Sequence, residues 1–283
     1  MLMQIAMIQD RIVDYDELDE AYLDRGTYFG DGVYEVLRSY GGKIFLLEKH
    51  LERFARSLGE IGIEGVDIDE IREKIITAYN RASIDEAKVY FHITRGIGPR
   101  NHGMVGELKP NFFLTVTELG DFRGEKEHGI KVSTYPDLRW KRCDIKSLNL
   151  LPNVLARLDA EKKGCVEAIL VSDAGEITEG SASAFFAVFA SDKNLVTRPL
   201  GTEILPSITR KLVVQVAVNA GLTVVEKALT PWQAKQADEL FIAVTTKDIV
   251  PVVEFDGVKI ADGKPGEYTN ALMKEINALV FSS

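Results

Sequence analysis

The stretch Arg142–Ala156 reads RCDIKSLNLLPNVLA and sets Lys146 between apolar and small polar residues, just ahead of a predicted helix. A lysine whose ammonium is partly desolvated can carry a carbonyl group as a Schiff base. Most lysines are solvated surface charges, so this stretch alone does not distinguish a reactive amine from an ordinary one. Whether Lys146 is a reactive amine has to be judged from the elements and motifs on either side of this stretch.

The composition is that of an ordinary globular protein. The chain has 283 residues, of which 46% are hydrophobic and 27% charged, and its formal net charge is -9. That charge argues against binding to nucleic acid or to an anionic membrane, because both would repel it. No apolar run has the length of a membrane span and no signal peptide is evident, so we expect a cytoplasmic, soluble protein. The two cysteines and four histidines form no disulfide framework and no metal-ligand spacing, so we expect no metal.

The residues ahead of the lysine stretch predict a small α/β unit. Alternating polarity marks the strands, and apolar residues at helical spacing mark the helices. The predicted elements are a hairpin that ends near Val13, a glycine-rich turn over 25–32, a strand over 33–40, a helix from Glu48, a helix capped by Asp67, and strands over 88–95 and 111–117.

The apolar pattern lapses between Glu118 and Gly129, where charge rises. We therefore expect a small domain over 1–119, a linker over 120–128 and a larger domain over 129–283. The larger one is predicted to hold strands over 130–135, 166–171 and 184–190, strands near Thr223 and Leu240, and helices over 153–163, from Ser207 to Gly221, from Thr230 and over 268–279. Strands and helices mix without strict alternation, which favours an α+β class with mixed sheets.

Two features, at Ser207 and at Glu179, suit a phosphorylated ring compound. Ser207 starts a predicted helix, where free N–H groups at Ile208 and Thr209 favour a phosphate, although plain N-capping explains the same residues. Glu179 could hold a ring nitrogen protonated and make the ring an electron sink, or could be a solvated turn carboxylate. Arg53 lies on a predicted helix, where a surface charge is the ordinary role.

Other polar side chains suit a small acidic substrate. Arg100 and His102 could hold a carboxylate together, or could form a solvated loop tip. Tyr34 lies on a predicted strand, where a core aromatic is the common role. Thr245 and Thr246 follow an apolar strand, at a position where ligands often bind.

In order and spacing, these pieces resemble the class IV, or fold type IV, pyridoxal-phosphate-dependent aminotransferases, and within that class the D-amino-acid aminotransferases. The resemblance covers nearly the whole chain. The motifs that carry it are Arg25-Gly26, Phe29 to Val36, His50 to Arg53, Thr94 to Gly96, Pro99 to His102, Asp144 to Asn149, Lys163 to Cys165, Thr178 to Ser181, Ile208 to Arg210 and Asp238 to Phe241.

The resemblance implies a two-domain homodimer that holds pyridoxal 5'-phosphate between its domains. Lys146 would form the internal aldimine and move the proton between substrate and cofactor, and Glu179 would keep the pyridine nitrogen protonated. The phosphate would be bound by Arg53, by the backbone at Ile208 and Thr209, and by Thr246. The substrate would be bound by Tyr34, Thr245, and a loop of the neighbouring subunit bearing Arg100 and His102.

The reaction implied is ping-pong transamination between a D-amino acid, D-alanine, and a 2-oxo acid, 2-oxoglutarate. The Arg100–His102 segment separates D-specific members from branched-chain aminotransferases and aminodeoxychorismate lyases. Arg38, Ala182 and Ala184 depart from the D-specific pattern, which leaves a branched-chain L-amino-acid or primary-amine aminotransferase as the alternative. Two further hypotheses are an aminodeoxychorismate lyase and a phosphate-ligand-binding protein without turnover. The presence of both Lys146 and Glu179 opposes the second of these.

Overall fold

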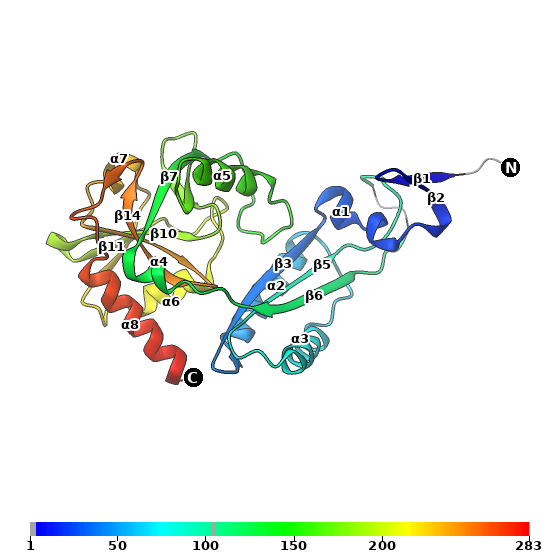
Figure 1. The fold of residues 1–283 in the computed structure, drawn as a ribbon, viewed down its shortest axis with the longest axis horizontal. Coiled ribbons are helices and arrows are strands. Elements are labelled where there is room, and N and C mark those ends of the chain that lie inside the picture. The colour runs from blue at the N-terminus through cyan, green and yellow to red at the C-terminus, as the bar shows by residue number, and fades with distance from the viewer. Residues whose placement is uncertain (1–3, 104–105, 283) are drawn as a thin grey trace.

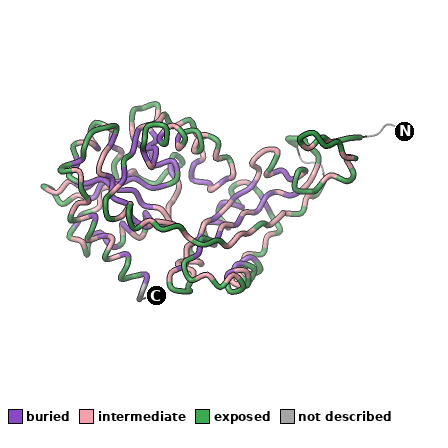
Figure 2. Tube along the Cα trace, viewed as in Figure 1, coloured by how far each residue is buried: buried purple, intermediate pink, exposed green. Residues whose placement is uncertain are grey.

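A computed structural model describes residues 4–103 and 106–282. The molecule is elongated and has two lobes, each built around its own β-sheet (Figure 1). Buried residues concentrate along the strands of both lobes, whereas the N-terminal hairpin at the far end is largely exposed (Figure 2). Helices and mixed sheets confirm the predicted α+β class. No helix in the described ranges has the length and apolar character needed to cross a membrane.

The small lobe is a four-stranded antiparallel sheet in the order β4-β3-β5-β6, with two helices on one face. In β3, Val33 and Leu37 are fully buried and pack with Phe54 and Phe91 into one core, while the alternate residues face away from the helices. The elements are β1 (Ile5–Ile8), β2 (Arg11–Asp14), η1 (Tyr15–Glu17), η2 (Glu20–Leu23), α1 (Arg25–Phe29), β3 (Gly32–Tyr40), β4 (Lys43–Ile44), α2 (Leu47–Glu60), α3 (Ile68–Ala82), β5 (Ala87–Thr94) and β6 (Asn111–Glu118).

One prediction in this lobe was wrong. The segment 25–32 was expected to be a turn, but it contains the short helix α1. Asp24 caps this helix by accepting a 2.6 Å hydrogen bond from the Gly26 N–H, and Gly30 ends it at φ 64, a conformation that glycine adopts without strain. The predicted cap of α3 is confirmed, because Asp67 accepts from two backbone N–H groups of its first turn.

The large lobe is a nine-stranded mixed sheet whose main order is β12-β11-β10-β13-β14-β7-β8-β9. Helices α6 and α8 cover one face, where Phe186 and Phe241 stack 4.8 Å apart, and α7 lies against the other. The elements are α4 (Arg123–His128), β7 (Ile130–Pro136), α5 (Leu151–Lys162), β8 (Glu167–Val171), β9 (Ile177–Gly180), β10 (Ala184–Phe189), η3 (Ala190–Asp192), β11 (Asn194–Thr197), α6 (Ile208–Val216), β12 (Thr223–Glu226), α7 (Pro231–Ala234), β13 (Glu239–Val244), β14 (Asp248–Phe255), β15 (Val258–Lys259) and α8 (Glu267–Ser282).

Some elements of this lobe differ from those predicted. The segment 120–128, expected to be an interdomain linker, contains the helix α4, which packs against β14. Ion pairs from Lys126 to Asp248 and from Lys247 to Glu125 explain why so polar a segment is helical. The helix after Ser207 ends at Val216 rather than at Gly221, and β11 was not predicted.

The lysine stretch has little regular structure and joins the two lobes. The Tyr34 N–H donates to the Lys146 carbonyl at 3.0 Å, and the Leu148 N–H donates to the Gly32 carbonyl at 3.0 Å, so the stretch pairs with the start of β3. Ile145 is buried in the small-lobe core. The backbone of Lys146 is thereby fixed against the small lobe while helix α5, which follows, packs on the large one.

Candidate active site

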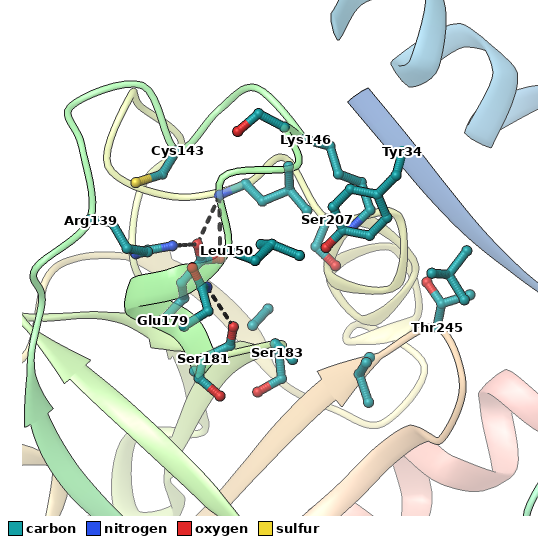
Figure 3. Close-up of a pocket in the computed structure, with 18 of the residues that line it drawn as sticks. Tyr34, Arg139, Cys143, Lys146, Leu150, Glu179, Ser181, Ser183, Ser207 and Thr245 are labelled. Atoms are coloured by element: carbon teal, nitrogen blue, oxygen red, sulfur yellow. Dashed lines mark hydrogen bonds and ion pairs between the residues drawn. The ribbon is translucent and has the colours of Figure 1, made fainter. Parts of the chain in front are cut away.

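A cavity of about 290 Å³ lies where the lysine stretch, β3, β9 and the β13–β14 loop meet. Figure 3 shows Lys146 beside Tyr34 on one side of this cavity, with Glu179 and Arg139 across from them. Six of the predicted site residues line it: Tyr34, Arg53, Lys146, Glu179, Thr245 and Thr246.

Lys146 offers an amine to this cavity. Its Nζ lies 4.2 Å from the centre of the Tyr34 ring. Within the described ranges no carboxylate lies within ion-pairing distance of this Nζ. The side chain therefore has an aromatic contact and no anionic partner among the described residues.

Glu179 is a buried carboxylate at the end of β9. It accepts a 2.5 Å hydrogen bond from Arg139 Nη1 and longer ones of 3.2 and 3.3 Å from the Leu205 N–H. Burial raises the pKa of Glu179, and the neighbouring Arg139 charge and these hydrogen bonds oppose that rise. The solvated turn carboxylate considered above is thus wrong for this position.

Arg139 was not predicted as a site residue. Asp137 binds its guanidinium through contacts of 2.9 and 2.8 Å and also accepts from the Thr178 hydroxyl at 2.7 Å. The pair stands just after β7, and the two residues are separated by one position, which is a local signal of an ion pair. Its link to Glu179 spans 40 residues and leaves no such signal in the sequence.

The N-terminus of α6 approaches the cavity through Ser207, which lines it and caps the helix by accepting from the Arg210 N–H at 3.1 Å. Ile208 and Thr209 are buried and border a smaller neighbouring pocket rather than the main cavity. Their N–H groups belong to the first turn, where no intrahelical carbonyl is available to them.

Arg53 is buried, so its expected ordinary role as a helix-surface charge is wrong. Its Nε and Nη2 donate to Glu35 at 2.7 and 2.8 Å, and its Nη1 donates to the Pro206 carbonyl at 3.2 Å. His50 Nδ1 lies 2.8 Å from the same carboxylate, and burial lowers the pKa of His50 despite this partner. Glu35 was not predicted as a site residue, yet it fixes the position of Arg53 beside the helix start.

The loop with Thr245 and Thr246 is held by a buried carboxylate. Asp248 accepts from Tyr40, from Arg38 at 3.0 Å and from Lys126 at 2.8 Å. Arg38 also donates to the Thr246 carbonyl at 3.2 Å. Arg38 therefore holds this loop in place and does not line the main cavity.

The loop with Arg100 and His102 lies away from the cavity of its own chain. Both side chains are exposed and pack near Phe29 of α1, at 5.6 and 5.1 Å, while Arg25 donates to the Asn101 carbonyl at 2.6 Å. The structure of one chain thus does not bring these two residues to Lys146.

Comparison with known proteins agrees with this geometry. The family model described as amino-transferase class IV matches residues 32–255. A D-alanine aminotransferase of Staphylococcus haemolyticus is 37% identical over 97% of each chain. Among solved structures, a branched-chain amino acid aminotransferase of Escherichia coli has a TM-score of 0.85 at 22% identity, covering 96% of this chain and 92% of that one. A hypothetical aminotransferase of Mycobacterium tuberculosis in a PLP-bound form has a TM-score of 0.82 at 20% identity, covering 96% of both chains.

The chain is a class IV aminotransferase. The matched segment of this aminotransferase begins in β3 and ends with β14, so it contains every residue that lines the cavity. The two solved structures establish its fold type, and the family match establishes amino-group transfer as its activity.

Proposed function

We propose that this class IV aminotransferase transfers the amino group of a D-amino acid, D-alanine, to a 2-oxo acid, 2-oxoglutarate. The observation that carries the proposal is one cavity in which Lys146, whose amine has no anionic partner among the described residues, faces a buried carboxylate, Glu179. The hand and the side chain of the substrate are taken from the D-alanine aminotransferase that is 37% identical over nearly the whole chain.

The residues present fit pyridoxal 5'-phosphate as the cofactor. Lys146 would hold its carbonyl carbon, and Glu179 would accept from its ring N–H in a site where burial strengthens that contact. The phosphate would be bound by Arg53, the first N–H groups of α6 and Thr246. When bound, the cofactor supplies an electron sink for the charge left at the substrate α-carbon.

The side chains have distinct tasks in the proposed reaction. The Lys146 amine, once free, takes the proton from the α-carbon of the amino acid in the first half-reaction. In the second half-reaction it gives a proton to the α-carbon of the 2-oxo acid. The Tyr34 ring limits where the Lys146 Nζ can lie, and its hydroxyl, together with Thr245, would orient the substrate. Arg139 and Asp137 keep the Glu179 carboxylate aimed at the ring nitrogen.

A second copy of the chain would supply Arg100 and His102 to bind the substrate carboxylate. Support for such a dimer comes from the outer face of α5, where four apolar side chains in two successive turns are exposed by 45% or more: Leu151, Val154, Leu155 and Leu158. An apolar helix face of this kind is typical of a surface that another chain covers. Because α5 directly follows the lysine stretch, a copy bound there would lie next to the cavity.

The test is spectroscopic. Purified protein loaded with pyridoxal phosphate should be yellow, and D-alanine should convert its absorbance to that of the pyridoxamine form, whereas Lys146→Ala should abolish turnover. Conversion by L-leucine and not by D-alanine would contradict the D-specific proposal. A protein that takes up no pyridoxal phosphate would contradict both enzyme hypotheses.

The alternative is a branched-chain L-amino-acid or primary-amine aminotransferase. It rests on the fold likeness to the Escherichia coli enzyme and on Arg38, which resembles the branched-chain pattern. Because Arg38 is bound to Asp248 and does not line the main cavity, it gives little support to a branched-chain substrate site. Ala182 and Ala184 do line the cavity and offer it no hydrogen bonds.

A further inference from the structure

Four cationic side chains line the cavity, and two of them are neutralised within the protein. Arg53 is paired with Glu35, and Arg139 is paired with Glu179. The other two are lysines. One is Lys146, which the proposed function uses, and the other is Lys88 on β5.

Lys88 has no anionic partner in the part of the chain that the structure describes, although its amine borders a cavity. The residue directly opposite it on β3 is Arg38, whose charge is taken up by Asp248 at 3.0 Å. Glu86, two residues before Lys88, lies 3.6 Å from the same Arg38 guanidinium. Lys88 is exposed and lines the cavity, so an anion that enters the cavity can reach its ammonium ion and form a charge-assisted contact.

The sheet register places Lys88 at a distance from the reactive amine. Tyr34, which contacts the Lys146 amine, pairs with His92, whereas Lys88 pairs with Arg38, four residues further along β3. At roughly 3.3 Å per residue this is about 13 Å along the sheet. Residues two and four apart on a strand share one face, so Tyr34 and Lys88 lie on the same side of the sheet at two positions of one cavity.

We infer that Lys88 binds the distal carboxylate of a dicarboxylic substrate, and that it is a specificity-determining residue of this site. The inference rests on the proposed function, in which a 2-oxo acid and a D-amino acid react at Lys146. The α-carbon reacts near Lys146 and Tyr34, and the side-chain carboxylate extends toward Lys88. A side-chain carboxylate that reaches Lys88 would meet a cation that no carboxylate of the described residues occupies.

The test compares two acceptors with D-alanine as donor. Lys88→Met removes the charge and retains the length of the side chain, and Lys227→Met makes the same change at an exposed lysine just after β12, outside the cavity. We expect Lys88→Met to lower kcat/KM for 2-oxoglutarate by about 10- to 100-fold, the loss of one charge-assisted contact. The kcat/KM for 2-oxobutyrate, which has one carboxylate, should change by less than about three-fold.

If Lys88 had only a structural role, its replacement would not change the ratio of the kcat/KM values for the two acceptors. The loss of kcat/KM for 2-oxoglutarate should come mainly from a higher KM. Lys88→Arg should restore most of the lost kcat/KM, and Lys227→Met should have the same kcat/KM as the unsubstituted enzyme. Equal losses for both acceptors, or an unchanged value for 2-oxoglutarate, would overturn the inference.

Binding of glutarate separates this inference from the proposed function, because glutarate has two carboxylates and cannot react. Loaded enzyme should gain more thermal stability from glutarate than from butyrate, and Lys88→Met should remove that difference. If no donor supports turnover and the glutarate effect still depends on Lys88, the proposed function fails and the binding site stands. If the glutarate effect is the same in Lys88→Met, the binding site is refuted whatever the activity.

Discussion

Replacing Glu35 by glutamine tests how the small lobe holds Arg53 in place. Glu35 is fully buried and accepts two hydrogen bonds from Arg53 and one contact from His50. Burial alone would raise the pKa of Glu35, but the Arg53 charge and the hydrogen bonds from His50 and Arg53 outweigh it and lower the pKa to about 2 from an ordinary 4.5. The folded protein thus holds this carboxylate ionised far more strongly than the unfolded chain does.

That lowering corresponds to about 3 kcal/mol of folding stability at neutral pH, at the lower end of the roughly 3–5 kcal/mol that breaking a buried ion pair costs. Because the pKa of Glu35 is lower in the folded state, the contribution is complete above about pH 5 and is lost as the pH falls from 4.5 toward 2. Glu35→Gln retains the shape of the side chain, so the loss of folding stability measures the contribution of the Glu35 charge.

The assay is urea unfolding at a series of pH values. Glu35→Gln should reduce the free energy of unfolding by about 3 kcal/mol at pH 7, and its difference from the unsubstituted protein should stay constant down to about pH 5 and narrow as the pH falls from 4.5 toward 2. Glu52→Gln, at an exposed position of α2, the helix that carries Arg53, is the control and should change the free energy of unfolding by less than about 0.5 kcal/mol. A loss below about 1 kcal/mol at pH 7, or a difference that does not narrow in acid, would refute the ion-pair reasoning.

Three further results are expected. Arg139→Leu should lower the free energy of unfolding by about 3–5 kcal/mol, because it leaves the buried Glu179 carboxylate without its guanidinium, and an unchanged urea midpoint would contradict this. Asp248→Asn should weaken pyridoxal-phosphate binding as well as stability, because Arg38 then loses the carboxylate that fixes the Thr246 loop, and equal cofactor affinity in a titration would count against it. Burial raises the pKa of the Cys143 thiol to about 11, so a disulfide reagent at pH 8 should label it only after unfolding, and prompt labelling of the native protein would oppose this.

Local patterns in the sequence predicted most of the regular structure. Asp67 caps α3 and Thr230 caps α7 as their spacing predicts, because a cap depends on side chains within three residues of the helix start. The alternation in β3 likewise follows from one buried and one open face. Helix α1 was missed since its first residue, Arg25, is held by contacts with Asp31 and with the loop around Asn101, which lies far away in the chain.

The candidate site likewise contains residues that local patterns predict and residues that depend on distant contacts. Lys146 and Glu179 could be named because each lies in a distinctive motif, and both line the cavity. Arg139 and Glu35 could not be named as site residues, because each acts through a partner at least 18 residues away in the sequence. No local pattern around either residue indicates that partner. Arg100 and His102 depend on a second chain in the proposed dimer, which no pattern within one chain can place.

The ion pairs around the cavity also bear on the reactivity of Lys146. A lysine paired with a carboxylate is held as an ammonium ion, which is neither a nucleophile nor a base. The acidic residues named in and beside this site are each bound to at least one arginine: Glu35 to Arg53, Glu179 and Asp137 to Arg139, Asp144 to Arg56 and Arg142, and Asp248 to Arg38. Because those carboxylates are committed, none is available to pair with the Lys146 amine. In the proposed reaction the arginines thus leave the Lys146 amine without an anionic partner among the described residues.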